Sequence, residues 1–211
     1  MKRALVLVGA SGVGKTTVAE KVLSLSDKFV LVRSATTRPR RGDGKDEEYV
    51  YLTEGEFRSR IDNGEMLEYT VYSGNYYGTP LSELESIFSQ GKTPLMILDL
   101  NGAKSLSNKS VLFDPVIVYL YETLDVIKRR LENRAGSSSA DVVISRMEQN
   151  LRDFLELPII CDIFSAFVKN TDLSVSANSV INLLSHKAKD NSENEKTAKM
   201  LALSAEKFII A

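Results

Sequence analysis

One stretch near the N-terminus has the spacing of a phosphate-binding loop. Residues 9–16 read GASGVGKT, the pattern G-x-x-x-x-G-K-[ST], and they follow the apolar run Ala4–Val8. In such a loop the glycines let backbone N–H groups turn towards a phosphate, and the following helix adds its dipole. Lys15 would reach the β and γ oxygens of a nucleotide, and the Thr16 hydroxyl would ligate Mg²⁺. The alternative is a glycine-rich turn without a ligand. It would require the spacing to arise by chance between an apolar strand and a helical segment.

Asp99 is the acidic group expected near such a metal. It ends the apolar run LMILD, residues 95–99. Its carboxylate would bind the metal directly or through water. As an alternative, Asp99 caps a helix at Asn101–Gly102. The sequence leaves both roles open.

A basic loop predicts a second phosphate site. Residues 34–44 read SATTRPRRGDG and place Arg38, Arg40 and Arg41 within four positions. A guanidinium group binds phosphate oxygens with two parallel hydrogen bonds and stays charged at any working pH. A solvated basic loop or an RNA-facing patch is the alternative. The nearby sequences EEY and SGNYYGT supply tyrosine hydroxyls, which favour one small phosphorylated molecule.

The composition indicates one soluble α/β domain, with room for subdomains. The chain has 211 residues, of which 43% are hydrophobic, and its 27 basic and 28 acidic residues nearly balance. This balance predicts no general attraction to nucleic acid or to an anionic membrane. A single cysteine, Cys161, excludes an internal disulfide framework, and Ala4–Val8 is too short to span a bilayer. We therefore expect a cytoplasmic protein without nucleic-acid or membrane partners.

Short apolar runs alternate with segments of helical periodicity, which predicts a parallel sheet with helices on both faces. The expected strands are Ala4–Val8, Phe29–Val32, Leu95–Leu98, Val116–Leu120 and Ile163–Val168. The expected helices are Lys15–Leu25, Pro80–Ser89, Leu124–Arg134 and Ala140–Leu155.

Two segments depart from this alternation. The stretch Glu47–Tyr77 carries short strand-like pieces around one helix, which is opened by the capping box Thr53–Glu56. We expect a small, partly antiparallel subdomain there. Residues 186–197 are polar and indicate a linker, and residues 198–211 then indicate a short amphipathic helix.

The sequence resembles the guanylate kinase family over residues 2–185. The motifs that carry the resemblance, in the family's order, are GASGVGKT, SATTRPRRGDG, Tyr49, MLEYTVYSGNYYGT, LMILDLNGAKSL, RRLENRAGSSSADVVISRM and VKNTDL. The resemblance implies a P-loop nucleoside monophosphate kinase fold with a GMP-binding subdomain at 34–82, a mobile lid at 125–150 and a tail at 187–211. It implies transfer of the γ-phosphoryl group of ATP to GMP and dGMP, with Mg²⁺ as cofactor, by a monomer or homodimer.

The resemblance also assigns roles to individual residues. Those implied in catalysis are Lys15, Arg38, Arg134 and Arg146. Those implied in ATP binding are Gly9, Ala10, Ser11, Gly12, Val13, Gly14, Lys15, Thr16, Thr17 and Asn170. Those implied in GMP binding are Ser34, Arg38, Arg40 or Arg41, Tyr49, Glu68, Tyr77, Thr79 and Asp99. Thr16 and Asp99 are the implied metal ligands.

Physical chemistry supports the base-binding role of Glu68. Guanine presents N1–H and N2–H₂ on one edge, and one carboxylate can accept both, whereas adenine would set its N1 lone pair against that carboxylate. In the alternatives, Glu68 is a solvated strand residue and Thr79 only caps the helix begun by Pro80. The other implied residues also have alternatives. Arg134 and Arg146 would each form an ordinary exposed ion pair with a nearby acidic residue on a helix, and Asn170 would only form a turn.

The chain departs from the family pattern in three places. The basic loop is one residue short, so the second phosphate arginine is Arg41 when counted from Arg38 and Arg40 when counted from the following glycine. Asn101 stands where the family has a second aspartate. Pro158 breaks the expected junction between helix and strand, which shifts the alignment that selects Asn170.

Two other functions fit parts of the pattern. Ribose 1,5-bisphosphate phosphokinase has the same fold but reads no base, and the absent second aspartate favours it. A guanylate-kinase-like domain that binds phosphorylated peptides would lack a working phosphate loop. In the kinase reading the acceptor is already anionic, so no general base is needed, and His186 and Cys161 have no assigned role.

Overall fold

The computed structural model describes residues 2–40, 49–72, 74–108, 113–135, 140–185 and 190–210. A five-stranded parallel sheet with the order β2-β7-β1-β8-β9 forms its centre. The strands are β1 (Arg3–Gly9), β2 (Phe29–Leu31), β7 (Thr93–Ile97), β8 (Asp114–Tyr121) and β9 (Ala166–Lys169). The parallel α/β architecture predicted from the sequence is confirmed.

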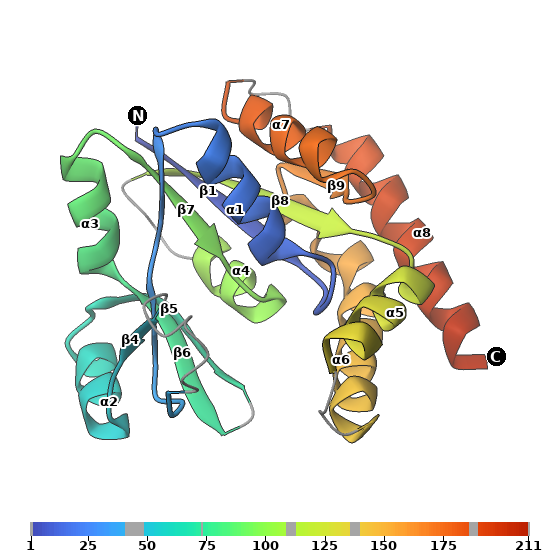
Figure 1. Cartoon of the computed structure of the whole chain (residues 1–211), viewed down its shortest axis with the longest axis horizontal. Helices are drawn as coiled ribbons and strands as arrows, with labels where there is room; N and C mark the ends of the chain where they lie inside the picture. The colour runs from blue at the N-terminus through green and yellow to red at the C-terminus, as the bar shows by residue number, and fades with distance from the viewer. Residues whose placement is uncertain are drawn as a thin grey trace.

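Helices cover both faces of this sheet (Figure 1). Helices α1 and α7 pack against each other on one face, and α4, α6 and α8 lie on the other face. The helices associated with this sheet are α1 (Lys15–Leu25), α3 (Leu81–Ser89), α4 (Leu100–Ser107), α5 (Leu124–Ala135), α6 (Ala140–Ile160), α7 (Leu173–Leu183) and α8 (Asn191–Ile210). The layered arrangement exposes the carboxyl ends of β1 and β7 between the helices.

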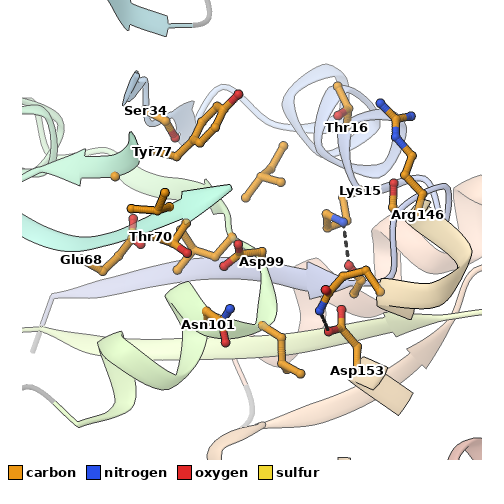
Figure 2. Close-up of a pocket in the computed structure, with 18 of the residues that line it drawn as sticks. Lys15, Thr16, Ser34, Glu68, Thr70, Tyr77, Asp99, Asn101, Arg146 and Asp153 are labelled. Carbon is orange, nitrogen blue, oxygen red and sulfur yellow. Dashed lines mark hydrogen bonds between the residues drawn. The ribbon is translucent and has the colours of Figure 1, made fainter. Parts of the chain in front are cut away.

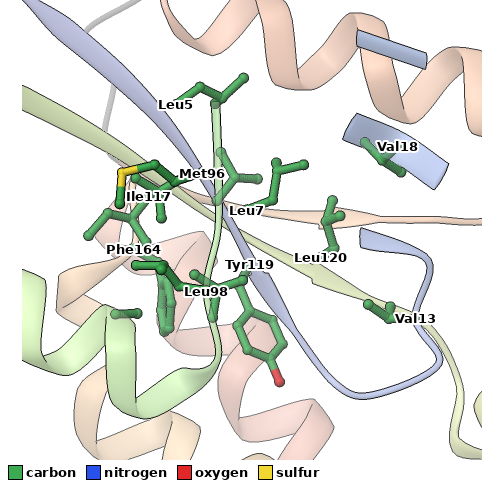
Figure 3. Close-up of a cluster of buried hydrophobic side chains, with 14 of the residues drawn as sticks. Leu5, Leu7, Val13, Val18, Met96, Leu98, Ile117, Tyr119, Leu120 and Phe164 are labelled. Atoms are coloured by element: carbon green, nitrogen blue, oxygen red, sulfur yellow. The ribbon is translucent and has the colours of Figure 1, made fainter. Parts of the chain in front are cut away.

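The central strand β1 is buried on both faces. Residues 4–8 have no exposed surface, because neighbouring strands flank β1 and helices cover its two sides. A strand in this position reads as a continuous apolar run. Figure 3 shows Leu5 and Leu7 of this strand among side chains from β7 and β8 and Phe164. This rigid strand ends directly at the phosphate-binding pattern.

A second sheet builds the predicted subdomain. Its order is β4-β3-β6-β5, with β3–β6 and β5–β6 antiparallel and β3–β4 parallel. The strands are β3 (Ser34–Thr36), β4 (Tyr49–Tyr51), β5 (Met66–Tyr72) and β6 (Asn75–Pro80). Helix α2 (Glu54–Asp62) begins with the predicted capping box, in which the Thr53 hydroxyl accepts from the Glu56 N–H. The helix packs its buried Phe57 against a small separate core with Ala35 and Met66.

Two expectations about segment ends are wrong. Helix α8 begins at Asn191, so residues 191–197, which their polarity indicated as a linker, are helical. Tertiary contacts override the local signal, because Asn194 is buried and donates from Nδ2 to the Phe164 carbonyl at 2.9 Å. Of the other five residues of that linker prediction, 186–189 lie outside the described part of the chain, and Asp190 directly precedes the helix.

Pro158 also does not break the helix as expected. It lies inside α6, which ends at Ile160 and continues as the 3₁₀ turn η2 (Cys161–Ile163). Proline is tolerated here because the neighbouring Leu157 and Phe154 are fully buried and hold this end of the helix against the core. The last predicted strand therefore starts at Ala166 and not at Ile163. In the described ranges, no helix is long and apolar enough to cross a membrane.

The buried hydroxyl of Tyr119 generates a stability prediction. Among the described residues it has no hydrogen-bond partner, and burial with the nearby Asp153 charge raises the pKa of Tyr119 well above its ordinary value. An unsatisfied buried polar group is costly, so Tyr119→Phe should raise the free energy of unfolding by up to about 1 kcal/mol. Urea denaturation checks this, with the exposed Tyr69→Phe as control. A loss of stability would show that the hydroxyl is bonded.

Candidate active site

A cavity of about 530 Å³ lies where the carboxyl ends of β1 and β7 meet the second sheet and α6. Figure 2 shows Ser34, Glu68 and Tyr77 on one side and Lys15, Thr16 and Arg146 on the other, with Asp99 between them. The other lining residues are Gly9, Ser11, Tyr49, Thr70, Val71, Gly78, Ile97, Leu98, Leu100, Asn101, Gln149, Asn150 and Asp153. The structure therefore brings most of the expected donor and acceptor residues around one space.

The phosphate-binding loop connects β1 to α1 by a tight backbone path. Gly9 has φ +149°, and a Cβ there would lie 2.3 Å from the Leu120 carbonyl oxygen. Gly14 has φ +104° and occupies the N-cap position of α1. Only glycine suits these positions, because a side chain would add both strain and overlap. The loop thus has the strand–loop–helix context that its pattern requires.

Lys15 bridges the two ends of this loop. Its Nζ donates to the Gly9 carbonyl at 2.6 Å and to the Ala10 carbonyl at 3.2 Å, and the side chain also lines the cavity (Figure 2). The ammonium group is therefore close to the position where the loop would enclose a phosphate. Thr16 follows it at the start of α1 and lines the same cavity. Ala10, Gly12, Val13, Gly14 and Thr17 complete the loop without lining this cavity.

The loop is supported from outside the cavity by residues far away in the sequence. Asn170 is buried, and its Nδ2 donates to the Val13 carbonyl at 2.8 Å. Arg130 donates to the same carbonyl at 2.9 Å and to the Asn170 carbonyl at 3.3 Å. Asn170 does more than form a turn, although it does not line the cavity. Sequence reasoning missed Arg130, which no local pattern separates from the adjacent Arg129.

Glu68 and Thr79 form a buried pair on the second sheet. Glu68 is 3% exposed, Thr79 is 1% exposed, and the Thr79 hydroxyl donates to Glu68 Oε1 at 2.7 Å. The alternative of a solvated Glu68 is therefore wrong. The alternative of Thr79 as a helix cap is also wrong, because Pro80 holds the N-cap position of α3 without a side-chain bond. Since Glu68 also lines the cavity, this pair presents a fixed carboxylate to a ligand.

Asp99 takes one of the two roles that the sequence left open, the helix cap, and its side chain also lies in the cavity; its role as a metal ligand stays a prediction. Its Oδ1 accepts from the Gly102 N–H at 2.7 Å and so caps α4, while its side chain lines the cavity together with Thr16. Carboxylate and hydroxyl oxygens are hard ligands, and Mg²⁺ is commonly held by one or two such groups plus substrate phosphates. Among the described residues no group of three or more acidic, histidine or cysteine side chains forms a complete metal cage. The donor set thus fits Mg²⁺ bound together with a nucleotide.

Arginines and tyrosines gather beside the second sheet. The Arg38 guanidinium lies 5.5 Å from the Tyr49 ring centroid and donates to the Tyr51 hydroxyl at 3.2 Å, and Arg40 lies 4.3 Å from the Tyr51 ring. Tyr49 lines the cavity, whereas Arg38 and Arg40 do not. Arg41 lies outside the described residues, so the choice between Arg40 and Arg41 stays a prediction. Sequence reasoning missed Tyr51, although its alternation with Tyr49 along one strand places both rings on one face.

Helix α6 contributes a polar face to the cavity. Arg146, Gln149, Asn150 and Asp153 line the cavity at helical spacing. Burial raises the pKa of Asp153, and repulsion from the Asp99 charge raises it further. A hydrogen bond of 2.7 Å that Gln149 Nε2 donates to Asp153 Oδ1 opposes this shift. Sequence reasoning identified Arg146 but missed the other three residues, which this i, i+3, i+4, i+7 pattern could have shown. The side chain of Arg134, on α5, lies outside the described part of the structure.

The fold and the site together define a P-loop nucleotide-binding protein. The defining features are a parallel sheet, a glycine-rich loop at the carboxyl end of its central strand, a lysine on that loop and an acidic group facing it. Comparison with known proteins narrows this class. A family model described as guanylate kinase matches residues 1–187. The chain belongs to the guanylate kinase family.

Individual relatives agree with this assignment. The chain is 40% identical to a guanylate kinase of Lactobacillus acidophilus over 156 residues, covering 72% of this chain and 75% of the relative. It is 34% identical to a guanylate kinase of Synechocystis over 181 residues, covering 85% and 92%. The crystal structure of a guanylate kinase from Anaplasma phagocytophilum has the same fold, with a TM-score of 0.64 at 23% identity over 90% of this chain and 88% of the other.

The glycine at the N-cap of α1 generates a prediction. A Cβ at Gly14 would lie 2.7 Å from Asn170 Nδ2 in addition to the cost of its positive φ. We expect Gly14→Ala to lower the free energy of unfolding by about 2–4 kcal/mol. The matched control is Gly64→Ala, where φ is +70° and no atom lies within 4 Å, so only the backbone cost of about 1–2 kcal/mol applies. Equal losses in denaturant titrations would contradict the close contact with Asn170.

Proposed function

We propose that this chain transfers the γ-phosphoryl group of ATP to GMP, and also to dGMP, giving ADP and GDP or dGDP. The observation that carries the proposal is the position of the buried Glu68–Thr79 pair in the same cavity as the phosphate-binding loop. Family membership supports it, because relatives that are 34% and 40% identical to this chain are named guanylate kinases. One end of the cavity suits a guanine base and the other a triphosphate.

At the acceptor end, Glu68 would accept N1–H and N2–H₂ of guanine. Its low exposure means that a wrong base would leave the carboxylate without these hydrogen bonds, which is a strong basis for selectivity. The Thr79 hydroxyl fixes one carboxylate oxygen, and Ser34, on the same side of the cavity as Glu68, would also contact the base (Figure 2). The deoxyribose sugar of dGMP leaves these base contacts unchanged.

The acceptor phosphate would bind beside the tyrosines. Tyr49 and Tyr77 line the cavity, and Arg38 stacks near Tyr49 with its guanidinium donating to the Tyr51 hydroxyl. A guanidinium held by aromatic rings loses little additional side-chain freedom when it binds a phosphate. Arg40 or Arg41 would supply the second positive charge. Asp99 would face the acceptor from the other sheet.

At the donor end, the loop backbone, Lys15 and Thr16 would hold the ATP phosphates. Mg²⁺, held by Thr16 and Asp99, would neutralise phosphate charge. Arg146 projects into the same space from α6 and would stabilise the transferring group, with Arg134 of α5 as its companion (Figure 2). Asn170 supports the loop next to the adenine end.

The reaction needs positioning more than proton transfer. The acceptor is an anionic phosphate oxygen, so no general base has to remove a proton, and the main barrier is repulsion between two charged substrates. Lys15 and the arginines reduce this repulsion by placing positive charge where negative charge gathers. Closure of residues 34–82 and 125–150 over the substrates would exclude water, which otherwise would hydrolyse ATP.

A coupled assay for ADP release tests the proposal. The protein is supplied with ATP, Mg²⁺ and one acceptor at a time: GMP, dGMP, AMP or ribose 1,5-bisphosphate. Turnover confined to GMP and dGMP is expected. Turnover on the sugar phosphate alone would assign the alternative kinase of the same fold, for which Asn101 in the cavity lining is the favouring observation.

Lys15→Ala tests the donor end of the cavity. Lys15→Ala should lower kcat by at least about 10²–10³-fold, because the ammonium group contacts the loop that holds the donor phosphates. The dissociation constant for GMP, measured by calorimetry, should stay within about two-fold, since Lys15 belongs to the other end of the cavity. The exposed Lys196→Ala is the matched control. Normal turnover in Lys15→Ala would refute the donor site.

Glu68→Gln tests the acceptor end of the cavity. Glu68→Gln should lower kcat/KM for GMP by about 10²-fold or more, because the amide replaces one acceptor oxygen by a donor that faces the guanine N–H groups. The KM for ATP should change little. Thermal unfolding should move by only a few degrees, since Thr79 can still donate to the remaining carbonyl oxygen. Unchanged preference for GMP over AMP would mean that another residue reads the base.

A further inference from the structure

The side chain of Asn150 pairs with the backbone of the phosphate-binding loop. The Ser11 N–H donates to Asn150 Oδ1 at 2.7 Å, and Asn150 Nδ2 donates to the Ser11 carbonyl at 2.9 Å. The two residues are 139 positions apart, and Asn150 is 1% exposed. A carboxamide has one donor and one acceptor side, as a peptide group does, so it satisfies both backbone groups of Ser11 together. Neither the sequence motifs nor the proposed mechanism gives this residue a role.

This contact joins two elements that border the donor end of the cavity. Ser11 belongs to the loop that ends at Lys15, whereas Asn150 lies one helical turn after Arg146 on the same face of α6. Lys15 and Arg146 both line the cavity (Figure 2). The Asn150–Ser11 contact is thus a direct hydrogen-bonded connection between the loop and the helix that presents Arg146.

The contact also constrains the loop itself. With its N–H and carbonyl both bonded to Asn150, Ser11 cannot rotate its backbone without breaking two partly buried hydrogen bonds. Leaving such groups unsatisfied costs about 1–3 kcal/mol each. On the other side of the loop, Asn170 and Arg130 hold the Val13 carbonyl, so Ser11 and Val13 are fixed from opposite directions.

We infer that Asn150 is a positioning residue for phosphoryl transfer, which sets the phosphate-binding loop and Arg146 at the separation that the transferring group requires. The inference rests on the proposed function. Asn150 acts through Ser11 and the helix and contacts no reacting atom. Its loss should therefore affect the rate of the chemical step and the affinity for ATP, and spare the binding of GMP at the far end of the cavity.

The test compares Asn150→Leu with a matched variant. Leucine has nearly the shape of asparagine and removes both hydrogen bonds. The matched variant is Asn194→Leu, because Asn194 is also a buried asparagine and donates to the Phe164 carbonyl at 2.9 Å, away from the cavity. We expect Asn150→Leu to lower kcat at least ten-fold and to weaken ATP binding at least five-fold, with KM for GMP within two-fold. Asn194→Leu should lower the melting temperature similarly and leave kcat within two-fold of the original protein.

A second variant tests the contact if Asn150→Leu fails to fold. In Asn150→Asp, the ionised carboxylate still accepts from the Ser11 N–H but faces the Ser11 carbonyl with a lone pair, whereas the protonated acid can donate to that carbonyl. The ratio of its kcat to that of the original protein should therefore rise as pH falls. Asp153, Lys15 and Arg146 also border this region, and they are the same in both proteins, so the ratio isolates position 150.

Several results would overturn the inference. These are a kcat for Asn150→Leu within two-fold of the original protein, an equal loss in Asn194→Leu, or a flat pH ratio for Asn150→Asp. If the original protein showed no turnover with GMP, the proposed function would fail separately. The affinity of Asn150→Leu for ATP would then decide, because unchanged affinity refutes the positioning role and at least five-fold weaker binding supports it.

Discussion

The carbonyl groups of the phosphate-binding loop have to stay bonded so that backbone N–H groups can turn towards a ligand, although the Ser11 N–H is itself bonded to Asn150 Oδ1. Side chains from several elements meet this constraint: Lys15 bonds the Gly9 and Ala10 carbonyls, Asn150 the Ser11 carbonyl, and Arg130 and Asn170 the Val13 carbonyl. A peptide group whose carbonyl is held on one side points its N–H to the other. The loop is therefore held open by hydrogen bonds from the fold around it, in addition to its glycines.

The remaining architecture follows from the need to hold the two ends of the cavity apart. The parallel sheet supplies a rigid apolar base under the loop, and the second sheet, with its own small core, supplies the buried carboxylate of Glu68. Two cores joined by few connections can change their relative position more readily than one continuous core. This division suits a protein that has to admit two charged substrates and then enclose them.

Local signals in the sequence were sufficient for part of the structure. The limits of α1, the capping box of α2 and the alternation of strands and helices that makes the sheet parallel depend on spacing, glycine and periodicity, which a short window contains. The start of α8 was missed because a buried bond from Asn194 to the Phe164 carbonyl outweighs local polarity. Asn150 and Arg130 were missed for a similar reason, since their partners lie more than a hundred residues away. Sequence patterns located the loop, and tertiary contacts decide what supports it.

Helix α6 is anchored more firmly at its carboxyl end than at its beginning. Residues 140–142 are exposed, whereas Phe154 and Leu157 are fully buried, and α8, which lies beyond the family match, packs against α6 and the turn η2 after it. Helix α6 is therefore held at its carboxyl end, and its first turn has fewer packing contacts. A tilt of about 10° around Asn150 displaces the backbone at Arg146 by only about 1 Å but at Ala140 by about 2.6 Å, given a rise of about 1.5 Å per residue. A pivot at Asn150 would therefore leave Arg146 almost in place while the outer turns of α6 moved.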